Sequence, residues 1–111
     1  THRGSSAASD VYKRQLLDDA RFVRNSLFHA SILSESQILK IDFHKFQPQG
    51  VTAFAMLAES HISIHTWPEE GVAKCDIFTC SDKCKPEKAV EYLGEAFEAE
   101  QIDSDTFDRL L

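Results

Sequence analysis

Three features are missing from this sequence: a long apolar run, an excess of basic residues and an even set of cysteines. No apolar stretch approaches the roughly 20 residues that a membrane-spanning helix needs. Acidic residues outnumber basic ones by 18 to 12, and the net charge of −6 argues against nonspecific nucleic-acid binding, which needs a basic face. We therefore expect neither a membrane nor a nucleic acid as a partner.

The cysteines and the opening residues bear on the cellular compartment. The three cysteines are an odd number, cluster toward the C-terminal end and show no C-x-x-C spacing, so they do not form a disulfide framework. No charged region followed by an apolar region opens the sequence, as it would in a secretion signal. Both observations favour a protein of the reducing cytoplasm.

A chain of 111 residues has the size of one domain. Its first fifteen residues, THRGSSAASDVYKRQ, follow neither the helical nor the strand period and are rich in Ser and Ala. We interpret residues 1–15 as a disordered or non-native N-terminal segment. Residues 16–111 are then expected to form a single domain.

The periodicity of the remaining residues predicts their secondary structure. Apolar residues recur at helical spacing in two regions, which predicts helices over about 15–31 and about 85–99. Four stretches between them have the composition or the alternation of strands: 38–46, 51–58, 61–67 and 72–79. Residues 107–111 are interpreted as a last strand or a frayed tail. This order predicts an α+β fold, a two-layer sandwich of a mainly antiparallel sheet with helices on one face.

Reactive side chains are concentrated in residues 59–69, ESHISIHTWPE, and in Cys80 beyond them. A metal site is one interpretation, because His61 and His65 are four residues apart. The β-branched alternation predicts a strand here, however, and four residues of strand span about 13 Å. Zinc needs ligands about 2.0–2.3 Å away, so two histidines of one extended strand cannot share an ion. We therefore expect no metal.

A hydrolase is a second interpretation, with Ser60 as the nucleophile beside a histidine and a carboxylate. Such combinations arise easily by chance, and the G-x-S-x-G turn that exposes a nucleophilic serine is absent. The hydrolase is therefore less favoured than the metal site.

A third interpretation comes from a resemblance. The run AESHISIHTWPE, with FHKFQPQGV before it and DIFTC after it, resembles the prokaryotic S-adenosylmethionine decarboxylase proenzymes over about residues 16–99. The resemblance implies that the chain cleaves itself between Glu59 and Ser60 and converts Ser60 into a pyruvoyl group, its cofactor. The ketone would form a Schiff base with the substrate amine and act as an electron sink. Members of this family usually open with a strand that contains a Gly-x-His element, which residues 1–15 do not resemble.

The same resemblance implies roles for six further residues. His65 matches the base that removes the α-proton of Ser60, and Thr52 matches a hydroxyl residue that supports processing. Cys80 matches the residue that returns a proton after carbon dioxide is lost, a role that suits a thiol. The last three match substrate-binding positions, namely the aromatic Phe46 and Trp67 and the ribose-binding Glu69.

The spacing of Ser60 and His65 has a consequence for assembly. In one continuous strand, residues five apart lie about 16 Å from each other and point to opposite faces. Either the strand breaks after Ser60, or the histidine arrives from a second protomer. The resemblance implies a dimer or a larger oligomer with sites at the interface, so we expect a homodimer or a dimer of dimers with shared active sites. Ser60 and Cys80 of one subunit would meet four residues of another: Phe46, Thr52, His65 and Glu69.

The expected function is decarboxylation of S-adenosylmethionine, which supplies aminopropyl groups for spermidine and other polyamines. Two alternatives stay open. Processing chemistry does not specify the substrate, so a related pyruvoyl-dependent decarboxylase acting on another amino acid, such as arginine, is one of them. A non-catalytic α+β dimer module, in which the motif is inactive, is the other. The sequence also leaves open whether the activator is putrescine, magnesium or none.

Overall fold

The computed structural model describes residues 7–79 and 83–106, with side chains from Tyr12 onward. Its elements follow in this order: α1 (Ala7–Asp18), α2 (Ala20–Leu33), β1 (Ile38–Lys45), β2 (Val51–Leu57), β3 (Ser60–Trp67), the short 3-10 helix η1 (Pro68–Glu70), β4 (Val72–Phe78) and α3 (Pro86–Ala96). Within these ranges no helix is long and apolar enough to cross a membrane.

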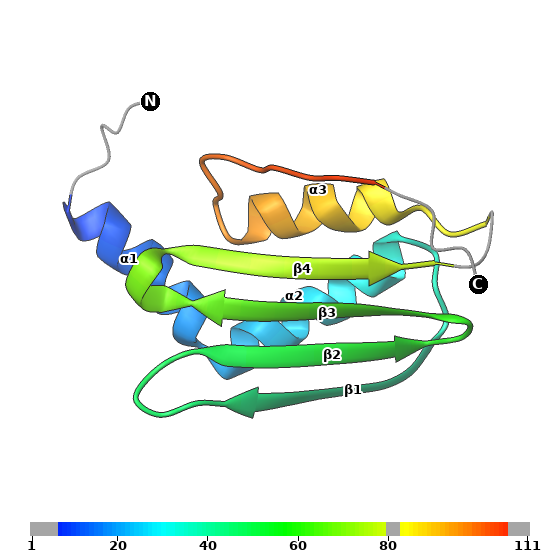
Figure 1. Ribbon diagram of the computed structural model, residues 1–111, viewed down its shortest axis with the longest axis horizontal. Helices are drawn as coiled ribbons and strands as arrows, with labels where there is room; N and C mark the ends of the chain where they lie inside the picture. Colours follow the sequence, from blue (N-terminus) through cyan, green and yellow to red (C-terminus); the bar gives the residue numbers. More distant parts are fainter. Residues whose placement is uncertain (1–6, 80–82, 107–111) are drawn as a thin grey trace.

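The four strands form one antiparallel sheet in which neighbours in sequence are neighbours in space, in the order β1-β2-β3-β4 (Figure 1). All four predicted strands are present, and the predicted α+β fold is confirmed. Short connections suffice because antiparallel neighbours can be joined by tight turns. The strands therefore lie side by side, and the turns that join them lie at the two ends of the sheet.

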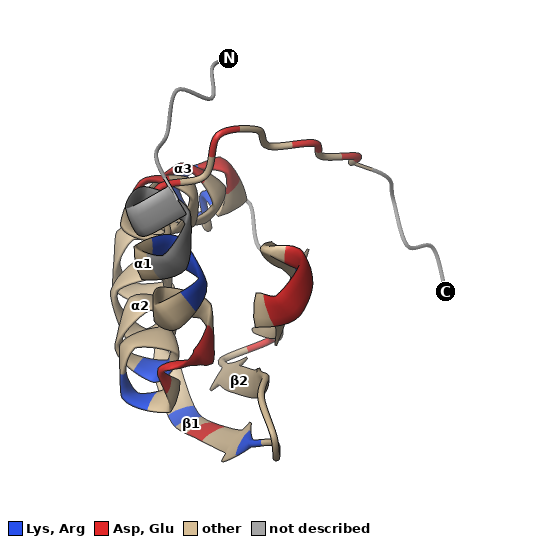
Figure 2. Cartoon of the chain, turned by 90° about the vertical axis from the view of Figure 1, so that its left-hand side faces the viewer, with Lys and Arg blue, Asp and Glu red and all other residues tan. Residues whose placement is uncertain are grey.

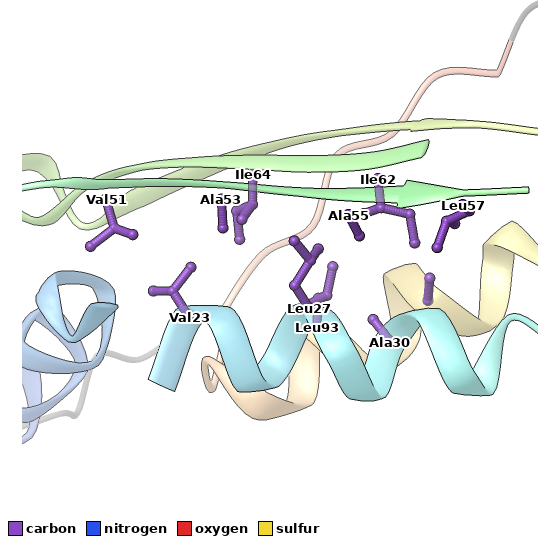
Figure 3. Packing of buried hydrophobic residues seen from close by; sticks show 11 residues of the cluster. Val23, Leu27, Ala30, Val51, Ala53, Ala55, Leu57, Ile62, Ile64 and Leu93 are labelled. Carbon is purple, nitrogen blue, oxygen red and sulfur yellow. The ribbon is translucent and has the colours of Figure 1, made fainter. Parts of the chain in front are cut away.

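The hydrophobic core lies between the sheet and the helices. Alternate residues of β2 and β3 are buried because successive side chains of a strand point to opposite faces. Figure 3 shows these side chains meeting apolar residues of α2 and α3. The members of this layer include Val51, Ala53, Ala55, Leu57, Ile62 and Ile64 from the sheet and Val23, Leu27, Ala30 and Leu93 from the helices.

The N-terminal helical region differs from its prediction. The sequence predicted one helix over about 15–31, but two helices are present because Asp19 has an extended backbone (φ −92°, ψ 101°). Its Oδ1 accepts a hydrogen bond from Phe22 N at 3.0 Å, so it caps the N-terminus of α2. The apolar period that begins at Leu16 runs across Asp19 into α2, which explains why it did not reveal the break.

Helix α1 begins at Ala7, within the segment 1–15 that we interpreted as disordered or non-native. Residues 7–18 contain Ala, Lys, Arg, Gln and Leu, which favour a helix without any apolar period. The division of the chain at residue 16 stays a prediction. Residues 107–111, interpreted as a last strand or a frayed tail, lie outside the described residues.

All three helices lie on the same side of the sheet (Figure 2). The side chains of β1 to β4 that point away from the helices form what we call the open face. Several of them are large and apolar yet exposed: Phe54 (40%), Met56 (46%), Trp67 (36%) and Val72 (36%). Exposed apolar side chains on one face of a sheet are a common feature of interaction surfaces.

Candidate active site

The β2–β3 hairpin contains the predicted cleavage position. Leu57 pairs with Ser60, so Ala58 and Glu59 alone form the turn. Glu59 has φ of 64°, in the left-handed region that costs a residue with a side chain about 1–2 kcal/mol. The peptide bond between Glu59 and Ser60 therefore follows a residue in a strained backbone conformation, and such strain is concentrated at functional sites.

The hydroxyl of Ser60 is unusual in its environment. Its Oγ is buried and has no hydrogen-bond partner among the residues that the structure describes. A buried hydroxyl without a partner costs about 1–3 kcal/mol, so one that persists calls for an explanation. An oxygen with no competing hydrogen bond is available to act on the adjacent carbonyl group.

A pocket of about 400 Å³ lies near the other end of β3. Its volume is within the range of about 300–1,000 Å³ that is typical of small-molecule sites. It is lined by residues of β2, β3, the β1–β2 connection and η1: Phe46, Gln49, Gly50, Thr52, His65, Thr66, Trp67 and Glu69. Two aromatic rings, one imidazole and one carboxylate thus border the same space.

The imidazole of His65 is oriented by Thr52. The two residues face each other across β2 and β3, and Thr52 Oγ1 lies 2.9 Å from His65 Nδ1. Because one ring nitrogen is engaged in this hydrogen bond, the other, Nε2, is the atom that can exchange a proton with a substrate or a second chain. The arrangement suits a general base.

Trp67 lies beside this imidazole, with ring centroids 6.3 Å apart. The ammonium group of Lys74 lies 5.6 Å from the centroid of the indole ring. This contact is a cation–π interaction, so the tryptophan at the pocket wall already attracts positive charge.

The buried hydroxyl of Thr66 joins three segments behind the pocket. Thr66 Oγ1 accepts a hydrogen bond from Val51 N at 2.9 Å and donates one to Leu17 O at 2.7 Å. Thr66 is only 5% exposed. The end of α1 is thereby bound to β3 at the residue between His65 and Trp67.

Asp18 forms a second tie, to the β1–β2 connection. Its Oδ1 accepts a hydrogen bond from Gly50 N at 2.7 Å and lies 3.0 Å from Lys45 Nζ. Burial acts to raise the pKa of Asp18, but the Gly50 amide and the Lys45 ammonium outweigh it and lower the pKa below its ordinary value. The carboxylate therefore holds both ends of the turn that carries Phe46 and Gln49.

Comparison with known proteins decides the family. The family model described as S-adenosylmethionine decarboxylase matches residues 7–110. The chain belongs to the S-adenosylmethionine decarboxylase family. The matched range begins inside the segment 1–15 that we had interpreted as disordered or non-native.

Individual relatives agree with the family. The chain is 48% identical to an S-adenosylmethionine decarboxylase proenzyme of Prochlorococcus marinus, covering 84% of this chain and 76% of that protein. It is 49% identical to one of Synechococcus, covering 75% of this chain and 65% of that protein. The crystal structure of the adenosylmethionine decarboxylase from Aquifex aeolicus is similar as well, with a TM-score of 0.74, 34% identity and coverage of 81% of this chain and 74% of that one.

Within this member of the S-adenosylmethionine decarboxylase family, the predicted site residues fall into two groups. Five of them line the pocket: Phe46, Thr52, His65, Trp67 and Glu69. Glu59 and Ser60 lie at the hairpin turn, and β3 is continuous from Ser60 to Trp67. Ser60 and His65 are therefore about 16 Å apart on opposite faces, and a break after Ser60 is excluded. Cys80 lies outside the described residues.

Other residues of the site were not predicted from the sequence. Gln49, Gly50 and Thr66 line the pocket, and Asp18 supports it from α1. Gln49, Gly50 and Thr66 belong to the runs FHKFQPQGV and AESHISIHTWPE, which are the signal that could have indicated them. No local signal indicates Asp18, because its partners are more than twenty-five residues away in sequence. Within residues 7–79 and 83–106, no group of three His, Cys, Asp or Glu side chains is close enough together to hold a metal ion.

Proposed function

We propose that this chain is a proenzyme that cleaves itself between Glu59 and Ser60, converts Ser60 into a pyruvoyl group and then decarboxylates S-adenosylmethionine for polyamine synthesis. The observation that carries the proposal is the buried, unpartnered Ser60 Oγ directly after the left-handed Glu59. A hydroxyl in this position fits the precursor of such a group. Membership of a family whose relatives are named proenzymes supports the same reading.

The proposed processing uses the residues of the chain itself. Ser60 Oγ attacks the carbonyl carbon of Glu59, and the acyl group moves from the amide nitrogen to the hydroxyl oxygen, which gives an ester. His65 of a second protomer removes the α-proton of Ser60, and Glu59 leaves as a carboxylate. The dehydroalanine that remains takes up water and releases ammonia. The resulting ketone supplies an electron sink when the substrate amine is bound.

Two observations support a site shared between protomers. Ser60 and His65 lie at opposite ends of the continuous strand β3, so they cannot meet within one chain. The open face carries exposed apolar side chains that a second copy of the chain would cover. We infer a homodimer, or a dimer of dimers, in which Ser60 and Cys80 of one protomer act with the pocket of the other. Cys80 would return a proton to the substrate carbon that loses carbon dioxide.

The pocket chemistry supports S-adenosylmethionine as the substrate. Phe46 and Trp67 offer ring faces for an adenine base or a sulfonium cation, an interaction worth about 0.5–2 kcal/mol. Glu69 offers carboxylate oxygens to the ribose hydroxyls. The guanidinium of arginine can also contact these rings and this carboxylate, but arginine has neither a ribose nor an adenine base to occupy the rest of the pocket.

Intact-mass measurement tests this proposal. The purified protein should resolve into fragments 1–59 and 60–111, and the second should be lighter by one ammonia than the product of plain hydrolysis. Ser60→Ala should remain a single chain because no hydroxyl is left to form the ester. The processed protein should release carbon dioxide from S-adenosylmethionine and not from arginine. A wild-type chain that stays intact after long incubation would contradict the proposal.

A further inference from the structure

His61, the residue that follows Ser60, is held between two phenylalanine rings on the open face. Its ring centroid lies 5.4 Å from that of Phe54 on β2 and 5.6 Å from that of Phe78 on β4. The rings are nearly parallel, with interplanar angles of 21° and 24°. One imidazole thus joins three strands through a continuous stack of rings.

A polar contact fixes the same ring in its own plane. His61 Nε2 lies 3.0 Å from Asp76 Oδ2, which belongs to β4. The stack restricts the ring perpendicular to its plane and this bond restricts it within the plane. The side chain of His61 is therefore held in all directions, although 28% of it is exposed.

These contacts around His61 become important if the chain is cleaved before Ser60, so this inference rests on the proposed function. In the intact chain, the turn of Ala58 and Glu59 connects β2 covalently to Ser60. Once the bond before Ser60 is cut, residue 60 becomes a chain end, and chain ends fray unless other contacts hold them. A reacting group at a frayed end would lose its alignment, and a misplacement of about 1 Å can cost about 100-fold in rate.

We propose that His61 is a positioning residue that holds the new chain end in place after cleavage. Residues 60 and 61 are joined by one peptide bond, so holding the ring of His61 also holds the backbone of residue 60 at the start of β3. His61 acts through the backbone and not by contact with the substrate. The exposed ring of Phe54 contributes to this positioning, since it forms one side of the stack.

The test compares cut and uncut forms of the same chain. A protease recognition site is inserted between Ala58 and Glu59 in the Ser60→Ala chain, which cannot cleave itself, and thermal unfolding is measured before and after the cut. His61→Ala should lower Tm at least twice as far in the cut form as in the uncut form. Ser63→Ala, a control on the same strand and face, should lower Tm equally in both. Equal losses for His61→Ala would overturn the proposal, because an ordinary packing role is the same in both forms.

Two further measurements use the self-processed enzyme. His61→Ala should still cleave itself, while kcat for decarboxylation falls about tenfold or more and KM changes little, as expected for a misplaced reacting end. His61→Phe retains the stack without the bond to Asp76 and should recover most of the lost rate. Unchanged kcat in the processed His61→Ala enzyme would also overturn the proposal. If the wild-type chain does not cleave itself, the proposed function fails, but the cut and uncut comparison still decides the role of His61.

Discussion

The two ends of β3 differ in what they contain. At the Ser60 end there is a strained two-residue turn, a buried hydroxyl without a partner in the described residues and a ring stack around His61. At the His65 end there is an open pocket, an oriented imidazole and two ties to α1. The Ser60 end has the backbone strain and the available hydroxyl group that the proposed cleavage needs, and the His65 end has the features of a ligand site. Under the proposed function, a single chain would carry two half-sites, which the continuous strand β3 keeps apart.

Complementation between two inactive variants is the strongest test of whether the two ends of β3 act together across an interface. Neither Ser60→Ala nor His65→Ala should process efficiently alone, because each lacks one half-site. Co-expression of the two should restore cleavage, and only in the chain that retains Ser60. Mass spectrometry of the mixed oligomer, with one chain isotopically labelled, measures this. Mixed oligomers that form without any cleavage would show that the half-sites do not meet across an interface.

The Cys80→Ala variant separates the making of the cofactor from its use. The acyl shift needs Ser60 and a base, so this variant should still cleave at least in part. Its rate of decarboxylation should fall by about 10²–10⁴-fold, the usual contribution of a general acid. Single-turnover assays on the processed fraction give this number. Undiminished turnover in that fraction would remove Cys80 from its proposed role.

Substitutions of Thr66 and Thr52 distinguish a threonine that stabilises the fold from one that supports cleavage. Thr66→Val leaves Val51 N and Leu17 O without their bonds and should reduce the free energy of unfolding by about 1–3 kcal/mol. Thr52→Val removes a more exposed bond to His65 and should cost less than about 1 kcal/mol, while it slows cleavage. Urea unfolding in the Ser60→Ala background and cleavage time courses give the two quantities. The reverse ranking of stabilities would contradict the assignment of Thr66.

The smallest expected effect concerns the strained turn. Glu59→Gly relieves the left-handed conformation and should raise Tm of the uncleaved Ser60→Ala chain by a few degrees, about 1 kcal/mol. In the chain with Ser60 it should also slow cleavage, because the strain is released. Glu98→Gly is the matched control, since Glu98 has φ of 54° and lies two residues after the end of α3. It should raise Tm similarly and leave the cleavage rate unchanged.

Much of the fold followed from the sequence, because each strand carries a local signal. Alternation in residues 61–67 predicted β3, and Pro68 ended it as expected. The break between α1 and α2 was missed, since Asp19 caps a helix in the middle of an unbroken apolar period. The position of η1 and the helical start at Ala7 were not predicted either.

The candidate site was predictable only in part. The strand geometry alone showed that Ser60 and His65 could not meet in one extended chain. The left-handed Glu59 gave no signal, because Gly or Asn usually marks such positions and Glu does not. The ties from Asp18 and Thr66 depend on how α1 lies against the sheet, which is a property of the whole fold.

If the site is shared as proposed, the unbroken course of β3 also affects the timing of activation. If the half-sites must come from different protomers, cleavage requires two chains to associate. The rate at which two uncleaved chains meet rises with the square of their concentration. A newly synthesised chain would then remain inert at low abundance and mature faster as more copies accumulate. Under this proposal, the continuous strand from Ser60 to Trp67 would make maturation depend on the expression level.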